Sequence, residues 1–337
     1  MKPRPCCGAF SASCAAAEER IMENNLPQPD NTMAGDDFRC GFVSLIGRPN
    51  VGKSTLLNRI LGEKIAIVTD KPQTTRNRIV GIKNLPKAQL ILVDTPGLHT
   101  PRGKLNEALV EASQNAWRDA DLVLVLLEAG SGSLRQGEKE ILEQAASGDL
   151  PFLVALNKVD TLPGDWAGRP DELPMVRQLM DDFGIVSGQL FFLSALTGEG
   201  VEELVAEMVS RLPRHPPYFP DDIQTEISER FWVQEVIREQ VFELTRDEIP
   251  YAVAVEIDYY HDLEKRLSIG ATIFVEQNSQ KGIIIGRGGS MLKKIGTRAR
   301  KEIEAFVGIP VYLELHVSVA KNWTKKPNML QRFGYQP

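Results

Sequence analysis

With 337 residues, of which 42% are hydrophobic and 25% charged, the chain has the composition of a globular protein of about two domains. No apolar run reaches the roughly 18 residues of a membrane-spanning helix, and a net charge of -6 excludes a uniformly basic protein but not a local basic face. The cysteines lack a CxxC spacing and predict neither a disulfide framework nor a zinc site: Cys6, Cys7, Cys14 and Cys40.

The first 39 residues are expected to be a disordered leader or to precede the true start of the protein. Residues 1–17 carry Lys2 and Arg4, no acidic residue and many Ala and Ser, which faintly resembles an organelle transit peptide. Met22 and Met33 are alternative starts, and Met33 lies only a few residues before the first expected strand. We therefore prefer the leader or misassigned start over the transit peptide.

Short apolar strands alternate with helical patterns through residues 40–212. Strands are expected at 42–46, 89–93, 122–127, 152–156 and 189–193, and helices at 53–61, 105–118 and 136–146. Near-continuous apolar strands separated by helices indicate a parallel sheet covered on both faces. The sequence thus predicts a first domain at 40–212 with an α/β fold and a mostly parallel sheet.

The loop GRPNVGKS follows a strand, precedes a helix and matches the phosphate-binding pattern GxxxxGK[ST] completely. Its glycines let backbone N–H groups point at phosphate oxygens, and the helix that begins near Lys53 adds its positive end. Lys53 supplies charge to the β- and γ-phosphates, and Ser54 offers a hydroxyl to Mg²⁺. The residues expected to contact nucleotide here are Gly47, Arg48, Pro49, Asn50, Val51, Gly52, Lys53, Ser54 and Thr55.

Three later segments select the nucleotide. DTPG places Asp94 where it can reach Mg²⁺ through water and Gly97 where its N–H can donate to a γ-phosphate. In NKVD, the Asp160 carboxylate can accept hydrogen bonds from N1–H and the exocyclic amine of guanine, whereas adenine has neither donor on that edge. SAL can place a backbone N–H on the guanine oxygen. Because all these motifs follow strands, they predict a GTP site at the carboxyl edge of the sheet, with guanine-side residues Asn157, Lys158, Asp160, Ser194, Ala195 and Leu196.

The stretch KPQTTRNR, residues 71–78, lies between the first two motifs. A threonine here would close over the γ-phosphate and Mg²⁺ when GTP is bound and be released after hydrolysis. The alternative is an ordinary polar loop. Position favours the switch, and we choose Thr75 over Thr74. The expected metal ligands are Ser54, Thr75 and Asp94, and the expected catalytic residues are Lys53, Thr75, Gly97 and Asn50.

Leu98 follows DTPG at the position where many GTPases carry a glutamine that orients the attacking water. Its side chain cannot do this, so intrinsic hydrolysis is expected to be slow or to use another group. Asn50 is the candidate, because its amide oxygen could hold a monovalent cation such as K⁺ beside the phosphates.

The run LPRHPPYFPDD, residues 212–222, has four prolines in eleven residues, and it predicts an extended, semi-rigid linker over 213–226. Residues 227–337 are expected to form a second domain of order α-β-β-α-α-β. Its helices are expected at 229–244, 280–285 and 290–306, and its strands at 251–259, 267–276 and 311–319. The last strand alternates apolar and polar residues, which is typical of a half-buried strand.

A second glycine motif, the GxxG loop of residues 286–289, lies between the last two expected helices. Such a loop lets a nucleic-acid backbone approach closely while single-stranded bases lie across the adjoining sheet and helix. Residues 281–301 contain seven basic residues and no acid, which favours a phosphate-binding face over a merely solvated helix. The expected RNA contacts are Lys281, Gly286, Arg287, Gly288, Gly289, Lys293, Lys294 and Arg298.

The chain resembles the Era family of bacterial ribosome-assembly GTPases from about Gly41 onward. The segments that carry the resemblance are GRPNVGKST, KPQTTRNRIVGI, VDTPGLH, NKVD, the PPY of the linker, LTRDEIPYAVAVEI, KGIIIGRGG and MLKKIG. The resemblance implies a P-loop GTPase domain followed by a smaller α+β type II KH domain. It also implies binding near the 3′ end of small-subunit ribosomal RNA during assembly of the 30S subunit, and peripheral contact with the inner membrane face. We further expect a cytoplasmic monomer that binds GTP and GDP.

Three functions are compatible with these motifs. In the first, GTP hydrolysis gates RNA binding, and the arrangement of the domains changes with the nucleotide. In the second, the chain is an RNA-binding adaptor whose first domain holds nucleotide structurally. The third, an ATP-dependent kinase, is disfavoured by Asp160.

Overall fold

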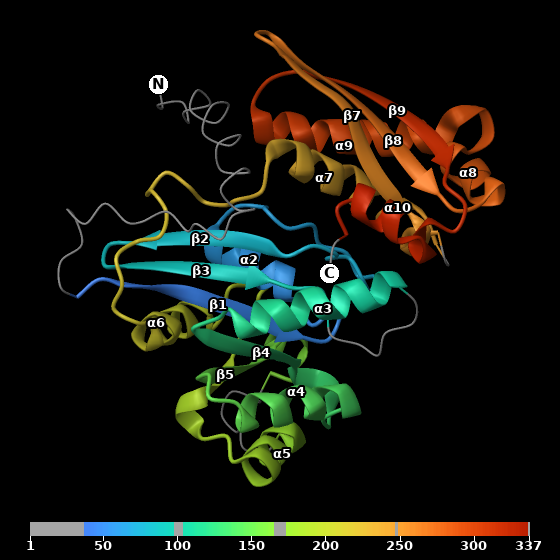
Figure 1. The fold of residues 1–337 in the computed structure, drawn as a ribbon. Helices are drawn as coiled ribbons and strands as arrows, with labels where there is room; N and C mark the ends of the chain where they lie inside the picture. Colours follow the sequence, from blue (N-terminus) through green and yellow to red (C-terminus); the bar gives the residue numbers. More distant parts are fainter. Residues whose placement is uncertain (1–36, 98–103, 165–172, 247–248, 336–337) are drawn as a thin grey trace.

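The computed structural model describes residues 37–97, 104–164, 173–246 and 249–335, and it shows one sheet-and-helix body lying against another (Figure 1). The first body is built on a six-stranded sheet of order β2-β3-β1-β4-β5-β6. Only the pair β2 and β3 is antiparallel, and the other neighbours are parallel. The strands are β1 Arg39–Gly47, β2 Ile79–Leu85, β3 Ala88–Asp94, β4 Leu122–Glu128, β5 Phe152–Asn157 and β6 Leu190–Phe192.

Helices cover both faces of this sheet, as the alternation of strands and helices predicts. One core holds Leu56 of α2 and Leu204 of α6, and the other holds Leu142 of α4 and Leu179 of α5. The helices are α2 Lys53–Leu61, α3 Lys104–Arg118, α4 Gln136–Ser147, α5 Pro174–Phe183 and α6 Val201–Arg211. The expected fold class of the first domain is therefore correct.

The edge strand β2 was not expected from the sequence. Its residues IVGIKNL do not alternate strictly, and Gly81 lowers their strand propensity. The structure gives Gly81 a packing reason, because a Cβ there would lie 2.5 Å from Cδ1 of Leu61 in α2. A tight helix contact, rather than a turn, accounts for this glycine.

The proline-rich segment after α6 is extended, and it packs along the first sheet. Cys40 donates its N–H to the Pro213 carbonyl at 3.2 Å, and the Gln89 side chain accepts from the N–H groups of Tyr218 at 2.8 Å and Phe219 at 3.0 Å. Burial raises the pKa of the Cys40 thiol to about 11. The segment thus follows the sheet surface instead of spanning open solvent between the domains.

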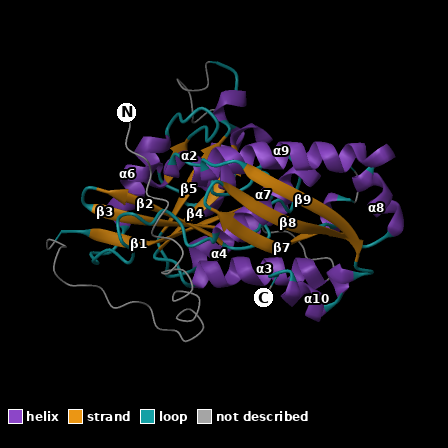
Figure 2. Cartoon of the chain, turned by 90° about the horizontal axis from the view of Figure 1, so that it is seen from above, coloured by secondary structure: helices purple, strands orange, loops and turns teal. Residues whose placement is uncertain are grey.

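The second body is a three-stranded sheet with the expected α-β-β-α-α-β order. β7 and β8 are antiparallel, β8 and β9 are parallel, and α9 lies alongside the strands (Figure 2). The elements are α7 Glu229–Leu244, β7 Ala254–Leu263, β8 Arg266–Val275, α8 Asn278–Ile285, α9 Ser290–Val307 and β9 Val311–Val319, followed by the unexpected α10 Pro327–Arg332. Short 3₁₀ turns lie at Ala129–Ser131, Val159–Thr161, Ser187–Gln189, Pro250–Ala252, Arg287–Gly289 and Trp323–Lys325. The expected strand at 251–259 begins later because Pro250–Ala252 forms such a turn.

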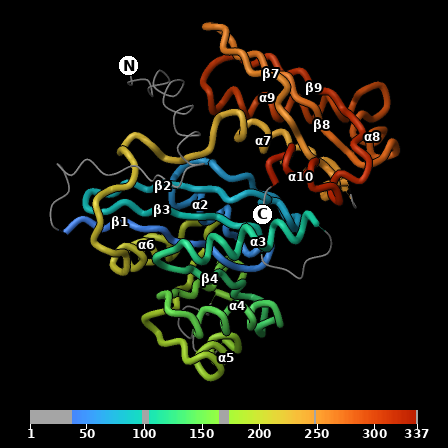
Figure 3. The backbone as a smooth tube through the Cα atoms, in the orientation of Figure 1, coloured from blue at the N-terminus to red at the C-terminus, as the bar shows by residue number. Residues whose placement is uncertain are grey.

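The last described residues of the chain return to the first domain (Figure 3). Trp323, Phe333 and Tyr335 share one hydrophobic cluster with Leu105 and Leu109 of α3. This cluster joins the helix that follows DTPG to the last described residues of the chain. Among the described helices, none is long and apolar enough to cross a bilayer.

Candidate GTP and RNA sites

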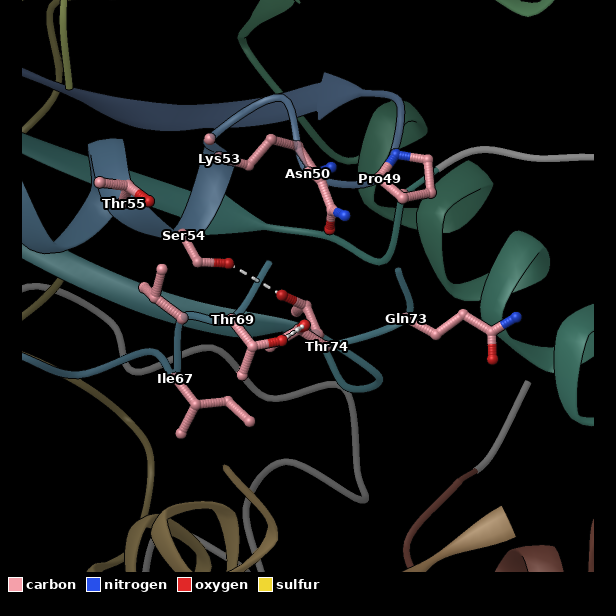
Figure 4. Close-up of a pocket in the computed structure, with 13 residues that line it drawn as sticks. Pro49, Asn50, Lys53, Ser54, Thr55, Ile67, Thr69, Gln73 and Thr74 are labelled. Atoms are coloured by element: carbon pink, nitrogen blue, oxygen red, sulfur yellow. Dashed lines mark hydrogen bonds between the residues drawn. The ribbon is translucent and has the colours of Figure 1, made fainter. Parts of the chain in front are cut away.

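The predicted nucleotide residues meet at one edge of the first sheet. The glycine loop follows β1, DTPG follows β3, NKVD follows β5 and SAL follows β6, so their parallel strands deliver all four to the same side. A pocket there is lined by the loop and by the switch segment, which we define as residues 62–78 between α2 and β2. Figure 4 shows Ser54 on one side of this pocket and Thr69 and Thr74 on the other.

The glycine loop is closely packed beneath the pocket. Gly52 has a φ of +102°, and a Cβ there would lie 2.2 Å from Nδ2 of Asn157. Lys53 is 6% exposed, and its ammonium donates to the carbonyls of Gly47 and Arg48, both at 3.1 Å. Burial lowers the pKa of Lys53 to about 8, while the Asp94 carboxylate opposes the shift. The lysine is thus held over the loop in position for a phosphate.

Three oxygen-bearing side chains converge beside Lys53. Ser54 Oγ donates to Asp94 Oδ2 at 2.5 Å and lies 2.8 Å from Thr75 Oγ1, which donates to the same carboxylate oxygen at 3.4 Å. Asp94 is fully buried, and burial raises its pKa against the opposing charge of Lys53. Within the described part of the chain, Asp94 Oδ1 has no hydrogen-bond partner. A buried, unpartnered carboxylate oxygen among hydroxyls fits a hard divalent cation such as Mg²⁺.

The two candidate switch threonines have different neighbours. Thr75 belongs to the Ser54 and Asp94 oxygen cluster. The Thr74 hydroxyl instead lies 2.5 Å from Thr69 Oγ1 and donates to the Lys71 carbonyl at 2.7 Å. This geometry favours Thr75 as the metal-side residue.

On the predicted guanine side, the Asn157 side chain links two loops. Its amide donates to the Val51 carbonyl at 2.7 Å and accepts from the Ala195 N–H at 2.9 Å, so it ties the glycine loop to SAL. Asp160 is exposed in the turn Val159–Thr161, where its carboxylate is accessible to a base. Lys158 has a φ of +67° and its ammonium donates to Glu128 at 3.1 Å.

The remaining loop residues surround the same pocket. The Asn50 amide nitrogen donates to the Asp70 carbonyl at 2.5 Å, which leaves its amide oxygen as the atom that the cation hypothesis requires. Gly97 lies against the loop, because a Cβ there would be 2.5 Å from the Pro49 nitrogen. Leu98 lies outside the described residues, as do residues 1–36 of the expected leader.

The GxxG loop of the second domain is open. Gly286, Gly288 and Gly289 have φ values of +71°, +57° and +79°, and a Cβ on Gly288 or Gly289 would meet nothing within 4 Å. Lys293 and Lys294 are exposed on α9 just beyond it, and Arg287 is exposed in the loop itself. Arg298, in contrast, is paired with Glu243 of α7 at 3.2 Å. The loop and the first turns of α9 therefore form an accessible basic surface, with Arg298 turned toward α7.

Comparisons with known proteins match both halves of the chain. Residues 42–158 match the family model described as 50S ribosome-binding GTPase, and residues 248–324 match the KH domain model. The chain is 50% identical to GTPase Era of Geobacter metallireducens over 305 residues, which cover 90% of this chain and 100% of that protein. This chain belongs to the Era family of GTPases. GTPase Era of Syntrophus aciditrophicus is 49% identical over 88% of this chain and 95% of that protein.

Solved Era structures share the whole described architecture. A crystal structure of Era in complex with MgGDPNP and nucleotides 1506–1542 of 16S ribosomal RNA is 36% identical, with a TM-score of 0.84 over 89% of this chain and 100% of that one. A variant of Aquifex aeolicus Era bound to GDP·AlF4⁻ matches with the same identity, TM-score and coverage. The resemblance, the GTPase activity and the fold of both domains expected from the sequence are confirmed.

Several residues that shape the site in this Era family member were not expected from its sequence. Arg59 of α2 donates to the Ala195 carbonyl at 3.1 Å, and Asn58 binds the backbone of Ile65 and Ala66. Arg76 and Arg238 are buried between the switch segment and the second domain. These side chains bind backbone groups. Because every residue has a backbone, such partners leave no motif in the sequence. The helix α7 is buried over most of its length, and its polar residues Glu235, Arg238, Glu239 and Gln240 are among the buried ones.

Proposed function

We propose that the chain is a GTP-driven switch that binds small-subunit ribosomal RNA near its 3′ end and acts in assembly of the small ribosomal subunit. The observation that carries this proposal is the similarity, over both domains, to Era in complex with a GTP analogue and the 3′ portion of 16S ribosomal RNA. In this proposal the first domain binds GTP or GDP, and the KH domain binds RNA.

In hydrolysis, each of these residues at the sheet edge has one proposed task. The Asp160 carboxylate accepts from the guanine edge, Lys53 and the loop N–H groups hold the phosphates, and the Gly97 N–H donates to the γ-phosphate. Ser54, Thr75 and Asp94 would hold Mg²⁺, which supplies charge neutralisation for the transferred phosphoryl group when bound. Thr75 reports the γ-phosphate state, because it reaches the pocket from the switch segment.

The rate of hydrolysis is proposed to be low without a further factor. The chain has Leu98 where an orienting glutamine would stand, and we propose that Asn50 assists by holding K⁺ beside the phosphates. The proximity of Asn50 to the switch segment, through the Asp70 carbonyl, supports this assignment.

For RNA, the proposal uses the open GxxG loop and the lysines beyond it. The glycines permit close backbone approach, and Lys281, Arg287, Lys293 and Lys294 neutralise phosphates. Arg298 contributes less, because Glu243 already neutralises its charge. We also propose, on the family resemblance alone, that the chain is a cytoplasmic monomer with peripheral membrane contact. Cell fractionation tests the location, and light scattering tests the oligomeric state.

Lys53→Ala tests the switch against the adaptor function. The variant loses charge on the phosphates and should fail both to hydrolyse GTP and to complete small-subunit maturation in cells. Lys87→Ala is the matched control, since Lys87 is exposed in the turn between β2 and β3. If Lys53→Ala cells mature small subunits normally, the adaptor function replaces the switch.

A further inference from the structure

The switch segment is held by α7 of the KH domain along its length. Near its start, the Val68 N–H donates to Glu239 Oε1 at 2.9 Å, and the Lys64 ammonium donates to Glu239 Oε2 at 2.6 Å. Further on, the Lys71 ammonium donates to the carbonyls of Phe242 and Thr245 at the end of the helix. A segment expected to move with the nucleotide therefore rests on the other domain.

Arg238 of α7 makes the contact nearest to the metal-side cluster. Its side chain is fully buried, and its Nη2 donates to the Thr74 carbonyl. Its Nε also donates to Glu235 Oε1 at 2.8 Å, and Nη2 donates to Glu235 Oε2, so the carboxylate fixes the plane of the guanidinium. The donor that reaches Thr74 is thus pre-oriented.

The contact acts on Thr75 through one rigid unit. The Thr74 carbonyl and the Thr75 nitrogen and Cα lie in a single peptide plane, which rotates only as a whole. Holding that carbonyl fixes where the Thr75 side chain starts. The Thr75 hydroxyl then lies 2.8 Å from Ser54 Oγ and 3.4 Å from Asp94 Oδ2.

Arg76 anchors the other side of Thr75 on the same domain. Its guanidinium, 2% exposed, donates to the Val253 carbonyl at 2.7 Å and to the carbonyls of Pro250 and Tyr251, both at 3.1 Å. It also donates to the Tyr335 hydroxyl at 3.3 Å. Both neighbours of Thr75 are therefore bonded to the KH domain.

We infer that Arg238, a residue of the KH domain, is a positioning residue for GTP hydrolysis, because it holds the peptide that aims Thr75 at Ser54 and Asp94. The inference rests on the proposed function, which takes Thr75 as an Mg²⁺ ligand. It implies that any partner that displaces α7 from the switch segment lowers the affinity of the GTP-bound site for Mg²⁺ and slows hydrolysis.

The test uses the full chain and measures kcat, KM for GTP and the Mg²⁺ concentration that gives half-maximal rate. Arg238→Lys keeps the charge beside Glu235 but loses the fork that reaches both partners. We expect about a fivefold fall in kcat and a similar rise in the half-maximal Mg²⁺ concentration, with KM changed less than about twofold. Arg238→Met combined with Glu235→Gln removes the buried pair together and should lower kcat about 10-fold.

Arg230→Met is the matched control on the same helix. Arg230 also donates to a backbone carbonyl, that of Ile257 at 3.1 Å, but this contact lies within the KH domain. Arg230→Met should therefore leave kcat and the Mg²⁺ dependence unchanged. If Arg230→Met lowers both as much as the Arg238 variants do, or if the Arg238 variants retain wild-type Mg²⁺ dependence, the inference is overturned.

Thr75→Ala separates this inference from the proposed function. If Thr75→Ala leaves the Mg²⁺ dependence unchanged, the proposed role of Thr75 fails. If Thr75→Ala raises the half-maximal Mg²⁺ concentration but Arg238→Lys does not, only the positioning role of Arg238 fails. In the double variant, the effect of Arg238→Lys should disappear, because Thr75 is the residue through which it acts.

Discussion

Two glycine loops, one in each domain, are predicted to contact phosphates, and they differ in how closely they are packed. In the first loop, added Cβ atoms on Gly47 and Gly52 would collide with the Leu126 carbonyl at 2.6 Å and with Asn157 at 2.2 Å. In the second, Gly288 and Gly289 face open space, and only their positive φ values require glycine. A packed loop suits one small ligand held in fixed geometry, whereas an open loop suits a polymer that extends beyond it.

Gly52→Ala should show the largest effect if the first loop is as tightly packed as the contacts indicate. The φ of +102° strains an alanine by about 1–2 kcal/mol, and displacement of Asn157 leaves buried polar groups unpaired at a cost of about 1–3 kcal/mol. A total of about 3 kcal/mol corresponds to about 100-fold weaker GTP binding, measured by calorimetry. Gly62→Ala is the control, with a φ of +82° but nothing within 4 Å of its Cβ; equal losses in both variants would contradict the packing argument.

Replacement of both Lys293 and Lys294 by Glu should have the next largest effect, and it should weaken only RNA binding. Each lost contact with a phosphate removes about 1 kcal/mol, so single-stranded RNA should bind at least about 30-fold more weakly. GTP hydrolysis without RNA should be unchanged. The paired control reverses Lys265 and Arg266, which are exposed at the hairpin between β7 and β8. Loss of both RNA binding and hydrolysis would mean that the α9 lysines are structural.

Gly289→Ala compares the second loop directly with the first. Its φ of +79° strains an alanine, but no atom lies within 4 Å of the new Cβ. The only cost is then the strain of an alanine in the glycine conformation, about 1 kcal/mol. This cost predicts about fivefold weaker RNA binding. Gly308→Ala, at the far end of α9 with a φ of +73°, should leave RNA affinity unchanged. A loss of about 100-fold for Gly289→Ala would show that the second loop is enclosed when it functions.

The smallest expected effect concerns a monovalent cation bound by Asn50 of the first loop. If Asn50 holds a monovalent cation, hydrolysis should be about threefold faster in K⁺ than in Na⁺ at equal ionic strength, a difference of about 0.7 kcal/mol at the barrier. Asn50→Ala should abolish the difference. Equal single-turnover rates in the two salts for the wild-type protein would remove Asn50 from the catalytic set.

Local patterns predicted most of the fold. Lys53–Leu61, Glu229–Leu244 and Val311–Val319 have the expected bounds, because glycine or serine marks both ends of the first helix and the start of the second, and the strand alternates apolar and polar residues. The edge strand β2 and the helix α10 have no such pattern. Their places depend on the packing of Gly81 against α2 and of Phe333 against Trp323, which are tertiary contacts.

The gathering of the predicted nucleotide residues at one sheet edge could also be predicted, because their order along the chain and their positions after strands constrain one another. Arg76 and Arg238 were not, since a buried guanidinium that binds backbone carbonyls of another domain looks in sequence like any charged residue. Arg298 was expected to bind RNA because it belongs to a basic run, yet its pairing with Glu243 depends on how α7 and α9 pack.

The packed course of the proline-rich segment limits how the two domains can move. Its last side-chain bond to the first sheet is from Thr225 to the Val80 carbonyl at 2.6 Å, and α7 begins at Glu229. Four residue steps join Thr225 to Glu229, and they span at most about 14 Å when extended. A rearrangement that keeps this bond cannot carry the KH domain far from the first sheet. Such a rearrangement is confined to a rotation near Glu229, and its displacement is largest at the parts of the KH domain farthest from Glu229.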